Sequence, residues 1–130
     1  MTYNQVHPDD FEYLNLLGKG GFGCVVQCRK KSTDMMYAMK IQSKDALINR
    51  CDGFYGRVLV ERNTLASCSH PYIISLDYAF QTEALVIMTM ELGVGTLTDA
   101  ALLCVNCVLP ETRVRFYTAE ICLALDHIHR

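Results

Sequence analysis

One glycine-rich stretch decides the fold of this chain: Leu17-Gly18-Lys19-Gly20-Gly21-Phe22-Gly23-Cys24-Val25. Its glycines follow a Gly-x-Gly-x-x-Gly pattern. Glycine has no Cβ, so its backbone N–H groups can approach phosphate oxygens closely. Two designs use this spacing: a dinucleotide-binding fold, in which the glycines open a helix, and a hairpin, in which a strand follows them.

The residues that follow the glycines favour the hairpin. Cys24 to Cys28 includes two adjacent valines, and β-branched side chains favour strands over helices. A dinucleotide-dependent oxidoreductase is therefore the weaker alternative. Saturable binding of NAD but not ATP would support it.

The rest of the chain predicts a sheet followed by helices. Strands are predicted over 11–17, 24–28, 36–41, 73–80 and 84–92, and a polar connection over 43–56. A helix is predicted over 58–66 between the third and fourth strands, and two more over 97–105 and 111–129. This order predicts an α+β fold: an antiparallel sheet with one inserted helix, then a helical unit.

Further motifs at matching positions carry a family resemblance. Val25 extends the glycine pattern, Ala38-Met39-Lys40 lies on the third predicted strand, and Glu61 shares a helix face with Val58. The chain thereby resembles a protein kinase catalytic domain, specifically the AGC group of Ser/Thr kinases. The matching segments are Asp10–Gly23, Met36–Lys40, Glu61–Leu65, His70–Ile74, Asp77–Thr82 and Leu109–Glu120.

The resemblance implies a division of the chain into parts. Residues 1–10 would be an N-terminal arm and 11–92 the kinase N-lobe, with a five-stranded antiparallel sheet and one inserted helix. Residues 93–96 would be the hinge or linker. Residues 97–130 would be the first two helices of the C-lobe, truncated before the catalytic loop.

An ATP site is also implied by the resemblance. Lys40 would contact the inner phosphates and be held by Glu61; these two are the expected catalytic residues. The glycines would form a flap over the phosphates, Met90 would be the gatekeeper, and Glu91 and Leu92 the hinge. The full set of expected ATP-binding residues is Gly18, Lys19, Gly20, Gly21, Phe22, Gly23, Val25, Ala38, Lys40, Met90, Glu91 and Leu92.

Two departures from the family pattern bear on activity. The run Gly93-Val94-Gly95 lacks the acidic residue that relatives carry after the hinge, and Asp99 could replace it. In addition, the Arg-Asp catalytic loop and the Asp-Phe-Gly motif do not occur in the sequence. We therefore expect the complete kinase, with Mg²⁺, to transfer the ATP γ-phosphoryl to protein Ser or Thr, and this chain alone to be inactive. The alternative is a non-catalytic fragment that binds nucleotide or protein.

Composition limits the classes of partner. Twelve basic and fourteen acidic side chains give a net charge of −2, so electrostatics predict neither a nucleic-acid nor a membrane partner. The start of the sequence has neither a basic region nor an apolar stretch, so we expect an intracellular, cytoplasmic protein. The resemblance to kinases implies that its partners are ATP and a protein substrate. The apolar stripe of the last predicted helix should pack on the rest of a C-lobe or on another protein; it comprises Val114, Thr118, Ile121, Leu125 and Ile128.

The cysteines raise one metal-site alternative. Seven cysteines are present, and Cys104, Cys107, His127 and His129 superficially resemble a zinc-ligand set. The two histidines stand two residues apart on a predicted helix, so they point to different faces. We therefore predict no metal site and ordinary thiols.

Overall fold

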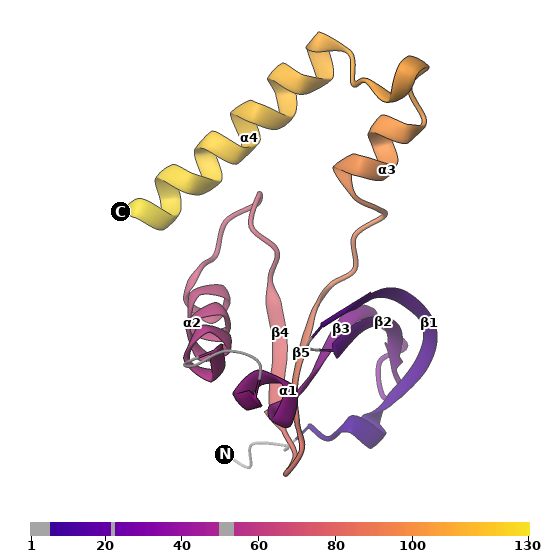
Figure 1. Cartoon of the computed structure of the whole chain (residues 1–130), viewed down its shortest axis with the longest axis vertical. Helices are drawn as coiled ribbons and strands as arrows, with labels where there is room; N and C mark the ends of the chain where they lie inside the picture. Colours follow the sequence, from indigo (N-terminus) through magenta and orange to yellow (C-terminus); the bar gives the residue numbers. More distant parts are fainter. Residues whose placement is uncertain (1–5, 22, 50–53) are drawn as a thin grey trace.

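The computed structural model describes residues 6–21, 23–49 and 54–130. The glycine-loop residue Phe22, expected to bind ATP, lies outside the described residues. Figure 1 shows a sheet with two helices beside it and a separate helical arm. In chain order the elements are η1 (Pro8–Asp10), β1 (Phe11–Gly20), β2 (Gly23–Lys30), β3 (Met36–Ser43), α1 (Lys44–Asn49), α2 (Phe54–Ser67), β4 (Leu76–Gln81), β5 (Leu85–Glu91), α3 (Leu97–Leu102), η2 (Val105–Cys107) and α4 (Glu111–His129).

All five strands form one antiparallel sheet in the order β1-β2-β3-β5-β4. This confirms the predicted sheet. The hairpin of β1 and β2 is built from the glycine-rich stretch, with Gly20 paired to Gly23. Because a strand and not a helix follows the glycines, the dinucleotide-binding design does not apply.

The segment between β3 and β4 corrects a prediction. Residues 43–56 were expected to be an irregular connection, but α1 occupies Lys44–Asn49 and α2 begins already at Phe54. Among the described residues, two helices are therefore inserted between β3 and β4, where one was predicted. The cause is burial: Leu47 of α1 is fully buried against Val58 of α2 and Met88 of β5. A helix of six residues is too short to show an amphipathic period in the sequence.

Several other boundaries also differ from the predictions, and for three of them the structure shows the reason. β1 runs on through the first glycines to Gly20, because its pairing with β2 continues there. β4 begins at Leu76 rather than 73, because Ile73 N–H donates to the carbonyl of His70 in a turn. α3 ends at Leu102, since the backbone of Cys104 is extended.

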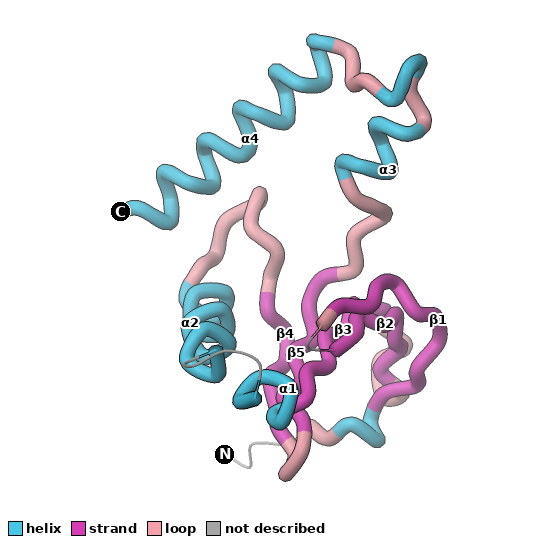
Figure 2. The backbone as a smooth tube through the Cα atoms, viewed as in Figure 1, coloured by secondary structure: helices cyan, strands magenta, loops and turns pink. Residues whose placement is uncertain are grey.

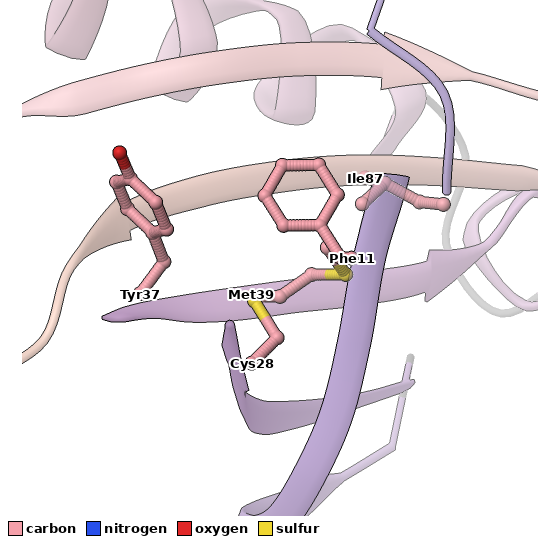
Figure 3. Packing of buried hydrophobic residues seen from close by; sticks show 5 residues of the cluster. All are labelled: Phe11, Cys28, Tyr37, Met39 and Ile87. Carbon is pink, nitrogen blue, oxygen red and sulfur yellow. The ribbon is translucent and has the colours of Figure 1, made fainter. Parts of the chain in front are cut away.

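The sheet is held by a core on the face of β3 opposite Lys40. Successive side chains of a strand point to opposite faces, so Tyr37 and Met39 lie on one face and Ala38 and Lys40 on the other. Figure 3 shows Met39, Tyr37 and Phe11 gathered with Cys28 and Ile87. Burying side chains of this size contributes roughly 1.5–3 kcal/mol each. This core fixes β3 and thereby the direction of Lys40.

The helical arm has few contacts with the sheet. Figure 2 shows a loop leading from β5 to α3 and then α4. α4 returns toward the α2–β4 connection, where the rings of His127 and His70 lie 4.9 Å apart. No α4 residue is buried, and the predicted stripe is exposed, with Ile121 at 50%. Within the described part of the chain, no helix has both the length and the hydropathy of a membrane span.

Candidate functional site

A cavity of about 410 Å³ lies between the β1–β2 hairpin, β3 and α2. The hairpin supplies its glycines, β3 supplies Lys40 and Gln42, and α2 supplies Glu61. The cavity thus brings together side chains from three separate parts of the sequence. Its lining includes the expected site residues Gly18, Lys19, Gly20, Gly21, Gly23, Val25, Lys40 and Glu61.

Lys40 and Glu61 form the charged pair of this cavity. The Lys40 ammonium donates to both carboxylate oxygens of Glu61, with Nζ 2.6 Å from Oε1 and 2.8 Å from Oε2. Local packing brings them together: Val58 is buried against α1 and β5, and Glu61 follows it one turn later. The pair is partly exposed, at 27% for Lys40 and 38% for Glu61, so the ammonium remains reachable by a ligand.

The glycines of the hairpin do two different things. At Gly23 a Cβ would lie 1.9 Å from the carbonyl oxygen of Ile41, so a side chain cannot fit between β2 and β3. At Gly18 and Gly20 a Cβ would meet no atom of the described residues within 4 Å. Gly23 is therefore needed for the strand pairing itself, whereas Gly18 and Gly20 keep open the space in front of the hairpin.

The remaining expected ATP-binding residues form a strip beside Val25, which itself lines the cavity. Val25 lies opposite Lys40 in the β2–β3 pairing and lines the cavity. Ala38 and Met90 are partners across β3 and β5, on the same sheet face as Lys40. Glu91 ends β5 and Leu92 follows it. Ala38, Met90, Glu91 and Leu92 do not line the glycine-side cavity.

Gln42 and Arg57 line the cavity but were missed in the sequence. Gln42 is only 5% exposed, and among the described residues its Oε1 has no hydrogen-bond partner. Strand alternation could have placed it on the Lys40 face, two residues on. Arg57 stands one helical turn before Glu61, so helical spacing could have placed it on the same face.

Asp99 is held by its own helix. Its Oδ2 accepts hydrogen bonds from Thr96 N, at 2.8 Å, and from Thr96 Oγ1, at 2.7 Å. In return Thr96 Oγ1 accepts from Asp99 N–H, which completes a capping box at the start of α3. These hydrogen bonds lower the pKa of Asp99. The carboxylate thus already has partners within α3.

Comparison with known proteins extends this picture. A family model described as "Protein kinase domain" matches residues 11–130. The chain is 42% identical to the RAC family serine/threonine-protein kinase homolog of Dictyostelium discoideum, covering 92% of this chain and 26% of that protein. It is 39% identical to serine/threonine-protein kinase akt-2 of Caenorhabditis elegans, covering 97% and 23%.

A third relative is Rho-associated protein kinase 1 of Homo sapiens, 41% identical over 96% of this chain and 9% of that protein. The chain therefore spans about a quarter, or less, of the length of these relatives.

Proposed function

Because this chain belongs to the protein kinase domain family, with AGC-group Ser/Thr kinases as its relatives, we propose that its sheet and cavity form the ATP-binding part of such a kinase. One observation carries the proposal. The Lys40–Glu61 pair and the open side of the glycine hairpin face the same cavity.

The triphosphate is proposed to lie beneath the hairpin. A phosphate chain needs cationic and N–H donors and room for close approach, and Lys40 supplies the cation. The space in front of Gly18 and Gly20 is open, which suits phosphate oxygens. Glu61 holds the Lys40 ammonium in place, which reduces the rotamer entropy lost when a phosphate binds. The described residues thus suit the phosphate end of ATP.

The adenine is proposed to lie on the neighbouring strip. Val25 and Ala38 would pack on the ring, because both are apolar and lie on the same sheet face as Lys40. Met90 would limit the depth of the site from β5. The backbone after it, at Glu91 and Leu92, would hydrogen-bond the adenine edge. These assignments rest on the family resemblance and on the sheet register.

Phosphoryl transfer to protein Ser or Thr is proposed for the complete kinase. That chemistry needs a carboxylate to orient the hydroxyl and ligands for Mg²⁺. Within the described residues, no three His, Cys, Asp or Glu side chains group so as to hold a metal ion. We propose that this chain contributes ATP binding and that the transfer step belongs to the complete kinase.

A binding role for α4 is a second proposal, favoured by its exposed apolar side chains. Phe116 is 60% exposed and Ile121 50% exposed along a helix without buried residues. Exposed apolar surface of this kind marks contact with protein. In a complete domain the remaining C-lobe would cover α4; otherwise another protein would.

ATP titration of the purified chain tests the main proposal. We expect saturable binding that Lys40→Met abolishes or strongly weakens. Lys44→Met is the matched control, because Lys44 contacts the carbonyl of Thr82 on the far side of β3 from the hairpin and does not line the cavity. Equal affinity of both variants for ATP would refute the proposed site.

A further inference from the structure

Cys104 and Cys107 lie at the two ends of one tight turn between α3 and α4. The backbone N–H of Cys107 donates to the carbonyl of Cys104 at 3.1 Å, which closes a four-residue turn. Such a turn brings its end Cα atoms within about 7 Å. Disulfides join cysteines whose Cα atoms are about 4.4–6.8 Å apart. The backbone therefore holds these cysteines at about the separation that a disulfide needs.

The two thiols differ in their surroundings. Cys107 is exposed, whereas Cys104 is partly buried. The Cys104 thiol donates to the carbonyl of Ala100 at 3.3 Å, and Arg113 Nη1 lies 4.0 Å from its sulfur. The Cys107 side chain is therefore the more exposed of the two, and the Cys104 sulfur contacts α3 and the start of α4.

The backbone of the turn is unusual in a way that favours this use. Asn106 and Cys107 both adopt left-handed conformations, with φ of 54° and 55°. Residues with a Cβ rarely do so, Asn being the main exception, and such conformations gather at functional sites. Here the left-handed conformations of Asn106 and Cys107 reverse the direction of the chain, so that the backbone N–H of Cys107 reaches the carbonyl of Cys104.

From this geometry we propose that Cys104 and Cys107 form a reversible dithiol–disulfide site that a hydroperoxide oxidises. The exposed Cys107 sulfur attacks the peroxide O–O bond, giving a sulfenic acid and releasing water or an alcohol. The Cys104 sulfur then displaces the sulfenic hydroxyl as a second water, and the S–S bond forms. Two thiols thereby lose two electrons, which the peroxide gains, and an external dithiol reverses the reaction.

The disulfide would act locally, on the path of the chain from α3 into α4. Its ring closes over only four residues, so it removes little entropy from the unfolded chain. Its main effect is to fix the turn that sets the direction of α4. The proposal is independent of ATP binding, because neither cysteine lines the cavity.

Other cysteines provide controls. Cys28 is fully buried, so it should not react in the folded chain. Cys122 is exposed on α4 and should react with peroxide without forming the same ring. Cys51 lies outside the described residues, and mass spectrometry monitors it separately through the peptide that contains it.

Mass spectrometry of the folded chain tests the site. The chain is treated with hydrogen peroxide, its remaining thiols are blocked with N-ethylmaleimide, and it is digested. We expect peroxide to remove two hydrogens from the peptide with Cys104 and Cys107, so that neither of these cysteines then takes up N-ethylmaleimide. Dithiothreitol before the blocking step should restore both thiols and therefore both labels. Cys104→Ser and Cys107→Ser should abolish this loss, and Cys122→Ser should keep it. A disulfide mainly between two chains, or with another cysteine, would overturn the proposal.

A variant pair separates turn geometry from mere closeness in sequence. Asn106→Gly keeps the left-handed backbone accessible, and Asn106→Val opposes it, because β-branched residues do not fit that region. We expect the Gly variant to form the disulfide as the parent chain does and the Val variant to form it more slowly. Equal rates in the two variants would show that the turn does not set the reaction.

Discussion

The ammonium of Lys40 lies 2.6 Å from Oε1 and 2.8 Å from Oε2 of Glu61, so a β3 cation and an α2 carboxylate share two hydrogen bonds. The pair lies in an open cavity, and both side chains keep about a third of their surface in contact with solvent. Ion pairs this exposed contribute only about 0–1 kcal/mol to stability. The pair therefore matters for what the ammonium can bind more than for holding the fold together.

Lys40→Met should separate binding from stability. We expect the free energy of unfolding to change by no more than about 1 kcal/mol. ATP affinity should fall about tenfold or more, because a hydrogen bond to a charged group contributes about 1.5–3 kcal/mol. Isothermal titration and urea unfolding measure the two quantities. Glu61→Gln should weaken ATP binding in the same direction, since the ammonium then loses its charged anchor. A large loss of stability with unchanged affinity would contradict this account.

Alanine substitutions at the hairpin glycines should affect two different quantities, the stability of the fold and the affinity for ATP. Gly23→Ala places a Cβ 1.9 Å from the carbonyl of Ile41, so we expect a loss of stability of about 1–3 kcal/mol or more. Gly18→Ala and Gly20→Ala meet open space and should keep the fold but weaken ATP binding. Thermal unfolding and ATP titration of all three variants distinguish the two effects. A Gly23→Ala chain as stable as the parent would show that the close approach is absent.

Gln42→Leu should stabilise the chain. The Gln42 side chain is 5% exposed, and its Oε1 meets no hydrogen-bond partner in the described part of the chain. A buried polar atom without a partner costs about 1–3 kcal/mol. Leucine has a similar volume and no polar atom to leave unpaired, so the midpoint of urea unfolding should rise. Gln27→Leu is the matched control, because Gln27 Oε1 accepts from Asn15 Nδ2 at 3.0 Å. It should not stabilise. A lower midpoint for Gln42→Leu would indicate that the amide has a partner in solution.

Acid should loosen the start of α3. Hydrogen bonds from the side chain and backbone of Thr96 lower the pKa of Asp99 from its ordinary value of 3.8. A lowered pKa means that the carboxylate stabilises α3 at pH values above 3.8, and that this contribution is lost as the pH falls through the lowered pKa. An NMR titration of the Asp99 carboxyl should show the shift, and Thr96→Ala should reduce it. Thr98→Ala should leave it in place, because the hydrogen bonds that lower the pKa come from Thr96.

Cys28 should be inert until the chain unfolds. Its side chain has no exposed surface, and burial raises the pKa of its thiol to about 11. Because the folded pKa is raised, the neutral thiol is favoured in the folded chain, and stability is lost as the pH rises above the ordinary value of 9.0. Ellman's reagent at pH 8 should label Cys107 but not Cys28, and urea should expose Cys28. Labelling of Cys28 in the folded chain would contradict its burial in the core of the sheet.

Much of the fold was predictable because its signals are local. α4 occupies Glu111–His129 as predicted, since Pro110 precedes a continuous helical pattern. The strand after the glycines was predicted from the adjacent valines Val25 and Val26, and β2 lies there. Patterns of this kind depend on neighbours in sequence, so a single chain displays them.

Other features depend on contacts between distant segments. α1 forms where the sequence predicted a connection, because Leu47 is buried against α2 and β5. The burial of Gln42 likewise follows from the helices that cover its sheet face, which strand alternation alone does not reveal.

The sequence by itself determined the order of the five strands, the glycine hairpin and the residue types that could meet a phosphate. Only the tertiary structure decided that Lys40 and Glu61, twenty-one residues apart, share two hydrogen bonds within one cavity. The physical reason is that periodicity fixes which face of a strand or helix a side chain occupies. Which side chain lies opposite Lys40 across the cavity depends on the packed cores on either side of β3, because these cores position α2 against the sheet.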